Sequence, residues 1–201
     1  MAMFRTTVIN PLIKGKPVFN ARRHFTVTSI HDSFPATLYR FQIHRDSRLY
    51  DKELKKGNED LEFADGVEIS KDGLVYPGIT NILSNGAVFM PNTRWMQQQT
   101  RMSYDYFLED MADRQPPDAF PHFLCIPKGT VIPKSLMLLR GRNIRCEFSL
   151  MPSSPMKLKE LNDTLTEFYL KHGTATPADE WLGSHGYAES FDESTDDYMR
   201  Y

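Results

Sequence analysis

Glu147 is the residue whose type and setting most clearly indicate chemistry. It comes directly before Phe148-Ser149-Leu150-Met151, an apolar segment typical of a short strand. A small β-rich enzyme positions a carboxylate in its cleft in this way, at a strand that a fixed turn introduces. A second interpretation stays open, in which Glu147 faces outward and pairs with Arg145 or Lys157.

Two other constellations in the same stretch could support nucleophilic chemistry. His122 and Cys125 could act as a base and a thiol, but at three residues apart across a strand start they face different directions. The segment Ser154–Lys157 matches the S-x-x-K pattern of some hydrolases, whereas the partner motifs Ser-Asp-Asn and Lys-Thr-Gly are absent from the sequence. Helix capping accounts for Ser154, and we expect ordinary packing for His122 and Cys125.

The elements around Glu147 are short strands joined by fixed turns. Ile126-Pro127 and Ile132-Pro133 bracket Lys128-Gly129-Thr130. Proline cannot donate to a sheet ladder and therefore lies at strand ends or edges. Glycine supplies the positive φ of a tight turn. We expect strands in the apolar runs 123–126, 136–139 and 147–151.

Other strands are predicted upstream. Residues 37–43 alternate apolar and polar side chains, as a half-buried strand does. Residues 67–70 and 74–76 flank Lys71-Asp72-Gly73, which is a hairpin signal. Ser84-Asn85-Gly86 is a further turn, and a strand over 87–90 follows it.

Two helices are predicted. The first runs from Arg94 to about Arg114, capped by Asn92 or Thr93 and stopped by Pro116-Pro117. The second starts at Ser154 with Pro155 in its first turn and ends near His172, before Gly173. Its buried stripe is formed by Leu158, Leu161, Leu165 and Phe168. Short strands with a few flanking helices, outside a βαβ alternation, predict an α+β fold with mostly antiparallel pairing.

Composition narrows the class of protein. The chain has 201 residues and a net charge of −2, so no excess of lysine and arginine indicates a general nucleic-acid binder. No apolar run approaches the ~20 residues that span a bilayer. Cys125 and Cys146 are the only cysteines; we expect two free thiols in a reducing compartment, although a single bridge stays open. No Cys/His cluster has zinc-ligand spacing, and no metal is expected.

Three segments are predicted. Residues 1–34 form a basic N-terminal arm or a transit peptide, because residues 1–31 hold five Lys and Arg and no acid before the aspartate at 32. Residues 35–171 form the domain. Residues 172–201 form an acidic tail, and Trp181, Leu182 and Tyr187 pin its first part.

Five motifs in order carry a family resemblance. They are Leu38-Tyr39-Arg40, Asp72-Gly73-Leu74, Ala87-Val88-Phe89, Ile126–Pro133 and Phe148–Met156. The segment that they span, about 35 to 170, resembles the toxin domain of the type VI secretion effector family Tse2. Three further segments are more similar to its fungal members: Met90–Thr93, Met96-Gln97 and Leu161–Phe168. The family's domain resembles NAD-dependent ADP-ribosyltransferases, which implies split antiparallel sheets and an NAD cleft.

The resemblance implies cleavage of the nicotinamide–ribose bond of NAD through an oxocarbenium-like state. A carboxylate near the ribose, Glu147, would stabilise that state by electrostatics and hold a hydroxyl. Arg40 would bind the pyrophosphate or the ribose, because a guanidinium matches phosphate oxygens; the alternative is a strand arginine in a surface ion pair. Tyr76 would stack on nicotinamide. Ser84 and Asn85 lie where the family carries hydroxyl residues of the site.

Two departures from the family pattern concern the site. The founding bacterial toxin has a histidine at the position of Glu147. The positions aligned with the family's hydroxyl residues are Gly86 and Ala87 here, so Ser84 or Thr80 would have to replace them from nearby. Loss of those hydroxyls is the main argument for a weakened or inactive relative.

The resemblance therefore implies a toxin that is an NAD-dependent mono-ADP-ribosyltransferase, with NAD as its substrate and a protein or nucleic-acid acceptor. An immunity or inhibitor protein is an expected partner and a membrane is not. We expect an intracellular location, in the mitochondrial matrix or the cytoplasm. The alternative is a catalytically inactive member of the fold that binds a protein through the acidic tail or the helix that begins at Arg94.

Overall fold

The computed structural model describes residues 27–52, 66–80, 83–110, 119–141 and 147–185. Within these ranges the chain forms β1 (Val27–His31), β2 (Leu38–Gln42), β3 (Tyr50–Asp51), β4 (Gly66–Val67), β5 (Ile79–Thr80), β6 (Leu83–Ser84), β7 (Ala87–Phe89), α1 (Arg94–Asp110), β8 (His122–Ile126), β9 (Leu136–Gly141), β10 (Phe148–Pro152), α2 (Leu158–His172), β11 (Thr174–Pro177) and α3 (Ala178–Ser184).

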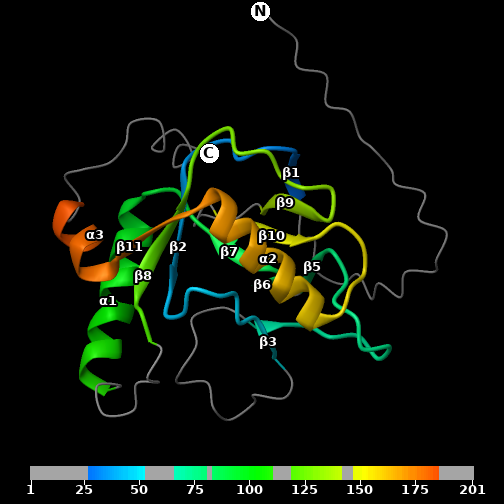
Figure 1. Ribbon diagram of the computed structural model, residues 1–201, viewed down its shortest axis with the longest axis horizontal. Coiled ribbons are helices and arrows are strands. Elements are labelled where there is room, and N and C mark those ends of the chain that lie inside the picture. The colour runs from blue at the N-terminus through cyan, green and yellow to red at the C-terminus, as the bar shows by residue number, and fades with distance from the viewer. Residues whose placement is uncertain (1–26, 53–65, 81–82, 111–118, 142–146, 186–201) are drawn as a thin grey trace, which may run out of the picture.

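Two antiparallel sheets form the centre of the fold. The four-stranded sheet has the order β1-β9-β10-β7, and the three-stranded sheet has the order β11-β8-β2. Strand pairs β3–β4, which is parallel, and β5–β6 add to them. In Figure 1 the three-stranded sheet lies on the left with α1 and α3, and α2 crosses in front of the four-stranded sheet. The predicted α+β class with mostly antiparallel pairing is confirmed.

A single backbone bridge joins the two sheets in the described part of the chain. Tyr39 at the start of β2 and Met90 after β7 exchange two hydrogen bonds, with N–O distances of 2.8 and 2.9 Å. This pairing places β2 beside β7, so the sheets meet along these strands. The split between the sheets therefore lies where the β2–β7 pairing ends.

The alternation predicted for 37–43 is present in β2. Leu38, Arg40 and Gln42 are buried, and Tyr39 and Phe41 are half-buried. Successive side chains of a strand point to opposite faces, so one face of β2 carries an arginine and a glutamine beside a core leucine. Two polar side chains are thus taken out of water together.

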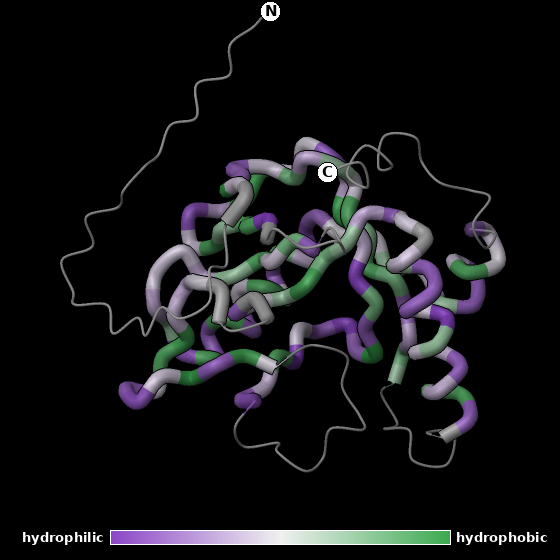
Figure 2. The backbone as a smooth tube through the Cα atoms, turned by 180° about the vertical axis from the view of Figure 1, so that it is seen from behind, coloured by the Kyte–Doolittle hydropathy of each residue, from purple (hydrophilic) through white to green (hydrophobic). Residues whose placement is uncertain are grey.

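Two hydrophobic cores stabilise the sheets. In the larger core, Phe34 meets Phe89 of β7 edge-to-face and stacks on Phe168 of α2, with ring centroids 5.7 and 5.9 Å apart. In the smaller core, Phe123 of β8 stacks on Trp181 of α3 with centroids 3.8 Å apart. Hydrophobic residues gather along the central strands in Figure 2, and hydrophilic residues prevail at the outer turns.

Helix α1 starts where the sequence predicted. The Thr93 hydroxyl accepts a hydrogen bond from the Met96 N–H at 3.2 Å, so Thr93 is the capping residue. The helix is described to Asp110, and the predicted end near Arg114 lies outside the described residues.

Helix α2 starts later than the sequence predicted. Its cap is Lys157, and its first residue is Leu158 rather than Pro155. The reason is a bridge between Met156 and Val75, which holds residue 156 in extended conformation through two backbone hydrogen bonds. The helix ends before Gly173 as predicted. A Cβ on Gly173 would lie 2.8 Å from the Tyr169 carbonyl oxygen and 2.4 Å from Leu124 Cδ1 of β8, so the close turn at the end of α2 favours glycine.

The predicted hairpin around Lys71-Asp72-Gly73 is reduced to one bridge between Ile69 and Val75. Gly73 has φ +79°, a conformation that favours glycine. Val67 belongs instead to β4 and pairs with β3. The turn was therefore predicted correctly, and its strands were predicted too long.

Segments that the sequence placed in the terminal arms also contribute elements. From the predicted arm 1–34, β1 pairs with β9 at the edge of the four-stranded sheet. From the predicted tail 172–201, β11 pairs with β8, and α3 buries Trp181 and Leu182. Residues 1–26 and 186–201, including Tyr187, lie outside the described residues.

Membrane-spanning helices and metal-binding clusters are absent from the described residues. None of the three helices is long and apolar enough to cross a membrane. No group of three or more His, Cys, Asp or Glu side chains within the described ranges is arranged to hold a metal ion.

We predict that Trp181→Ala destabilises the whole domain. Trp181 is 3% exposed, and its removal leaves a cavity against Phe123 that should lower the free energy of unfolding by about 3–5 kcal/mol. Urea denaturation measures the change. Leu170→Ala is the control, because Leu170 is 73% exposed and its loss should change stability by less than about 0.5 kcal/mol. Equal stability of the Trp181 variant and the wild type would show that α3 is not part of the cooperative unit.

Candidate functional site

A pocket of about 190 Å³ lies where the two sheets meet. Strand β2, strand β7 with the residue that follows it, helix α1 and the residue before β10 form its walls. The lining residues are Arg40, Phe41, Val88, Met90, Trp95, Met96, Gln99, Thr100, Ser103 and Glu147. Arg40 and Glu147, which the sequence analysis assigned to one NAD cleft, therefore line one pocket.

Arg40 marks the point where the sheet splits. After the Tyr39–Met90 bridge, continued antiparallel pairing would set Phe41 opposite Val88, but no second β2–β7 bridge occurs among the described residues. Instead the Val88 carbonyl accepts a hydrogen bond from Nη1 of Arg40 at 3.3 Å. The arginine side chain thus contacts the neighbouring strand where the backbone ladder ends.

The guanidinium is fixed by a second contact along its own strand. Nε of Arg40 donates to Oε1 of Gln42 at 3.1 Å. Arg40 is only 4% exposed, and a buried cation is tolerated only where its donors have partners. These contacts hold the side chain at the pocket wall, and its burial contradicts the exposed position of the predicted alternative.

The Gln42 amide connects Arg40 to a buried histidine. Nε2 of Gln42 lies 3.2 Å from Nε2 of His122 on β8, and the Nδ1 atom of His122 bonds to the Phe120 carbonyl. Burial lowers the pKa of His122 from its ordinary value of 6.5, and the nearby Arg45 and Arg40 lower it further, while the Phe120 carbonyl acts in the opposite direction. His122 is therefore neutral at physiological pH.

Glu147 enters the pocket from the other sheet. It comes directly before β10, whose first residue, Phe148, is completely buried beside Phe89. Because side chains alternate along a strand, Glu147 lies on the face opposite to Phe148, the face that also carries Ser149. The Ser149 backbone pairs with Val88, which also lines the pocket. The half-buried carboxylate is thus positioned by a strand whose next side chain is fixed in the core.

Helix α1 supplies the wall that the sequence did not reveal. Trp95, Gln99 and Ser103 follow one another at four-residue steps and lie on one side of the helix. The Gln99 and Ser103 side chains make no hydrogen bond within the described part of the chain, so their polar atoms are available at the pocket. The four-residue spacing of Trp95, Gln99 and Ser103 could have predicted from the sequence that these side chains share one side of the helix.

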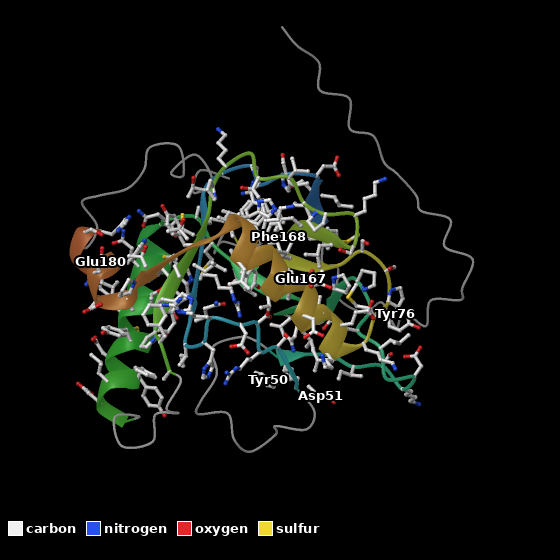
Figure 3. All side chains as sticks on the ribbon, in the orientation of Figure 1. Tyr50, Asp51, Tyr76, Glu167, Phe168 and Glu180 are labelled. Carbon is white, nitrogen blue, oxygen red and sulfur yellow. The ribbon has the colours of Figure 1, made fainter. Side chains whose placement is uncertain are left out.

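Tyr76 and Asn85 lie elsewhere. The Tyr76 hydroxyl donates to the Asp72 carboxylate at 2.6 Å, and Figure 3 shows Tyr76 on the side of the molecule away from α3. The Asn85 amide accepts from the Glu68 N–H at 2.7 Å and donates to the Tyr76 carbonyl at 2.9 Å. Neither residue lines the pocket around Arg40, and the Asn85 amide serves to hold backbone segments together.

The turn before β7 is tightly packed. A Cβ on Gly86 would lie 2.4 Å from the Leu150 carbonyl oxygen, and Ala87 is completely buried. A hydroxyl side chain at 86 would collide with β10, and one at 87 would enter the core. The Ser84 backbone pairs with β5, and its side chain, like that of Thr80, lies outside the described residues.

His122 and Cys125 do not form a catalytic pair. His122 bonds to Gln42 and Phe120, and burial raises the pKa of the Cys125 thiol, which keeps it protonated at neutral pH. Cys125 is a free cysteine, and Cys146 lies outside the described residues.

Split antiparallel sheets with a pocket at their junction are consistent with the fold of ADP-ribosyltransferases. A model of the Tse2 ADP-ribosyltransferase toxin family matches residues 36–181, more than half of the chain, and the chain belongs to this family. No curated protein and no solved structure was found to match it. The family match extends through β11 into α3, elements that lie beyond the predicted domain end at residue 171.

We predict that His122 makes stability fall in acid. Its pKa in the folded protein lies below 6.5, so the unfolded chain binds more protons between these two values. The contribution is complete above pH 6.5 and is lost as the pH falls toward the folded pKa. Urea denaturation between pH 5 and 8 measures it.

His122→Gln is the comparison variant, because its amide oxygen can accept from Gln42 without titrating near neutral pH. His31 also has a lowered pKa through burial and acts with the same sign, so the difference between the two proteins isolates His122. Parallel stability–pH curves would contradict the prediction.

Proposed function

We propose that the protein is an NAD-dependent mono-ADP-ribosyltransferase toxin whose reaction takes place at the pocket between the two sheets. The observation that supports this function most strongly is that Arg40 and Glu147, from different sheets and far apart in the sequence, line the same pocket. Membership of the Tse2 ADP-ribosyltransferase toxin family supports the substrate and the reaction class.

Charge complementarity supports the orientation of NAD. Its pyrophosphate is anionic and favours the guanidinium of Arg40, whose planar fork of donors suits phosphate oxygens. Its nicotinamide ring carries a positive charge, as does the oxocarbenium-like transition state, and both favour the Glu147 carboxylate. The nicotinamide riboside part therefore lies toward Glu147, and the pyrophosphate lies toward Arg40.

The pocket fits part of the dinucleotide. Its volume of about 190 Å³ is below the ~300–1,000 Å³ of pockets that enclose a drug-sized ligand, so it accommodates one ring system with its sugar. Trp95 and Phe41 offer aromatic surface for a flat ring. The adenosine part of NAD then lies outside this pocket.

The reaction breaks the bond between the nicotinamide nitrogen and C1 of the ribose. Nicotinamide leaves with the bonding electron pair, and a nucleophilic atom of the acceptor bonds to C1 and gives up its proton. Glu147 stabilises the positive charge that develops on the ribose and accepts a hydrogen bond from a ribose hydroxyl. The apolar wall of Met96, Phe41 and Val88 excludes water and strengthens this interaction.

The finer assignments follow from the same proposal. The acceptor is an intracellular protein or nucleic acid, in the cytoplasm or the mitochondrial matrix, and an immunity protein is the expected inhibitor. The likeness of Met90–Thr93 to fungal members and the roles of Tyr76, Ser84 and Asn85 in NAD binding stay predictions.

A second function has its own support. Met102 and Tyr106 of α1, four residues apart on one side of the helix, are 60 and 37% exposed. An apolar helix face of this kind suits a binding module that keeps the fold without turnover. Nicotinamide release distinguishes the two functions, because a binding module releases none.

We predict that Glu147→Gln lowers the rate of nicotinamide release from NAD by about 100- to 1,000-fold, the usual effect of removing one group that stabilises transition-state charge. Glutamine keeps the shape of the side chain and removes its charge. Chromatography of released nicotinamide measures the rate. Glu160→Gln on the exposed face of α2 should match the wild type, and an equally active Glu147 variant would exclude the assigned role.

We also predict that Arg40→Lys weakens NAD binding, because an ammonium cannot reproduce the guanidinium fork. NAD at 100 times its Kd should stabilise the wild type by about 2.7 kcal/mol. Thermal shift with increasing NAD should show a higher midpoint concentration for the variant. Arg48→Lys is the control, since Arg48 is an exposed residue that pairs with Asp46 at 3.0 Å. Identical NAD curves for Arg40→Lys and the wild type would remove Arg40 from the binding site.

A further inference from the structure

We propose that Gln42 and His122 are positioning residues for Arg40: they fix the direction of its guanidinium, and the binding of NAD depends on a neutral His122. The inference rests on the proposed function and adds two residues that do not line the pocket. It is carried by the hydrogen-bonded chain from Arg40 through Gln42 and His122 to the Phe120 carbonyl.

The two ends of this hydrogen-bonded series determine which atom donates and which accepts in each of its hydrogen bonds. Nε of Arg40 can only donate, so the Gln42 atom that faces it must be the amide oxygen. The NH₂ group of Gln42 then faces His122, whose Nε2 must accept. The proton of the neutral ring is therefore on Nδ1, where it is donated to the Phe120 carbonyl, which can only accept.

Because the series of hydrogen bonds is buried, losing any one of its residues disturbs the others. Gln42 and His122 are 7% and 1% exposed, so solvent does not replace a partner that is lost. A buried donor without a partner is costly, and the side chains rearrange rather than leave one. If Gln42 no longer accepts from Nε, the guanidinium loses the contact that sets its direction along β2.

Protonation of His122 reverses the direction of its hydrogen bond with Gln42. Both ring nitrogens then donate, and Gln42 must turn its amide oxygen toward His122. The NH₂ group of Gln42 would then meet Nε of Arg40, donor against donor, and the arginine would leave its position.

The charges around His122 oppose its protonation. Arg45, Arg40 and His44, from β2 and the residues after it, lower the pKa of His122 electrostatically. From the other neighbour of β8, strand β11 sets uncharged Pro177 opposite His122. Glu147 lines the pocket together with Arg40. NAD affinity should therefore be constant above pH 6.5 and fall below it.

Gln42→Met tests the positioning role, because methionine has a similar length and neither donates nor accepts strongly. Calorimetric titration at pH 7.5 should show that the Kd for NAD rises about ten-fold, the usual cost of losing a hydrogen bond to a charged group, with a smaller change in kcat. Gln42→Glu, which still accepts from Arg40, should restore most of the affinity. Gln97→Met is the matched control, since Gln97 is also buried and bonds to Asn92 rather than to Arg40 or His122.

The pH dependence of the Kd for NAD distinguishes positioning of Arg40 from a contribution to stability alone, which would leave that dependence unchanged. The Kd of the wild type should rise as the pH falls below 6.5, and that of His122→Gln should stay flat. Unchanged affinity in Gln42→Met, or the same acid dependence in His122→Gln, would overturn the inference.

Nuclear magnetic resonance of the free protein separates this inference from the proposed function. We expect ¹⁵N shifts of a neutral His122 with the proton on Nδ1, and an Arg40 Nε–H signal that exchanges slowly in the wild type and rapidly in Gln42→Met. A proton on Nε2 of His122, or equal exchange in both proteins, would overturn the chain itself. If these signals are as expected and the wild type does not bind NAD, the proposed function fails while the positioning of Arg40 stands.

Discussion

The burial of the Arg40 guanidinium is the constraint on which the arrangement of the site depends. A cation that is 4% exposed would be strongly destabilising without hydrogen-bond partners. The chain supplies the Val88 carbonyl from the neighbouring strand and the Gln42 amide from the same strand. Gln42 in turn requires an acceptor, which His122 provides from β8. The buried charge of Arg40 thus accounts for the buried polar side chains of Gln42 on β2 and His122 on β8.

The same arginine explains how a pocket arises between two well-packed sheets. Backbone pairing joins β2 to β7 only through Tyr39 and Met90 in the described chain. The larger core contains residues of both sheets, and the smaller core packs Phe123 of β8 against α3. Beyond this bridge the Val88 carbonyl bonds to a side chain instead of a backbone N–H. The strands diverge at that point, and α1, capped by Thr93, covers the space between them.

The pocket combines opposite charges with an apolar wall. The guanidinium of Arg40 and the carboxylate of Glu147 enter from different sheets, and Trp95 and Met96 of α1 line the same pocket. In such surroundings the effective dielectric constant is lower than in water, so each charge acts more strongly on a bound ion. NAD, the substrate that we propose, has an anionic pyrophosphate and a cationic nicotinamide ring, and this arrangement suits both.

The sequence alone determined those strands and helices whose hydrophobic pattern repeats among residues close together along the chain. The alternation of 38–42 predicted β2, because period-two burial is a property of a single strand. The apolar run from Phe148 predicted β10, whose five residues are all buried. The stripe from Leu158 to Phe168 predicted α2, although not its first turn. There Met156 is held extended by Val75, a partner that no local pattern identifies.

Only the tertiary structure decided which side chains share a site. Gln42 bonds to His122 across two strands far apart in the sequence, and Gln99 reaches the pocket because α1 packs at the junction of the sheets. Helix α3 has seven residues, too few to be stable alone, and forms because Trp181 stacks on Phe123. Each of these contacts depends on the packing of distant segments, whereas the patterns that predict a strand or a helix describe only neighbours along the chain.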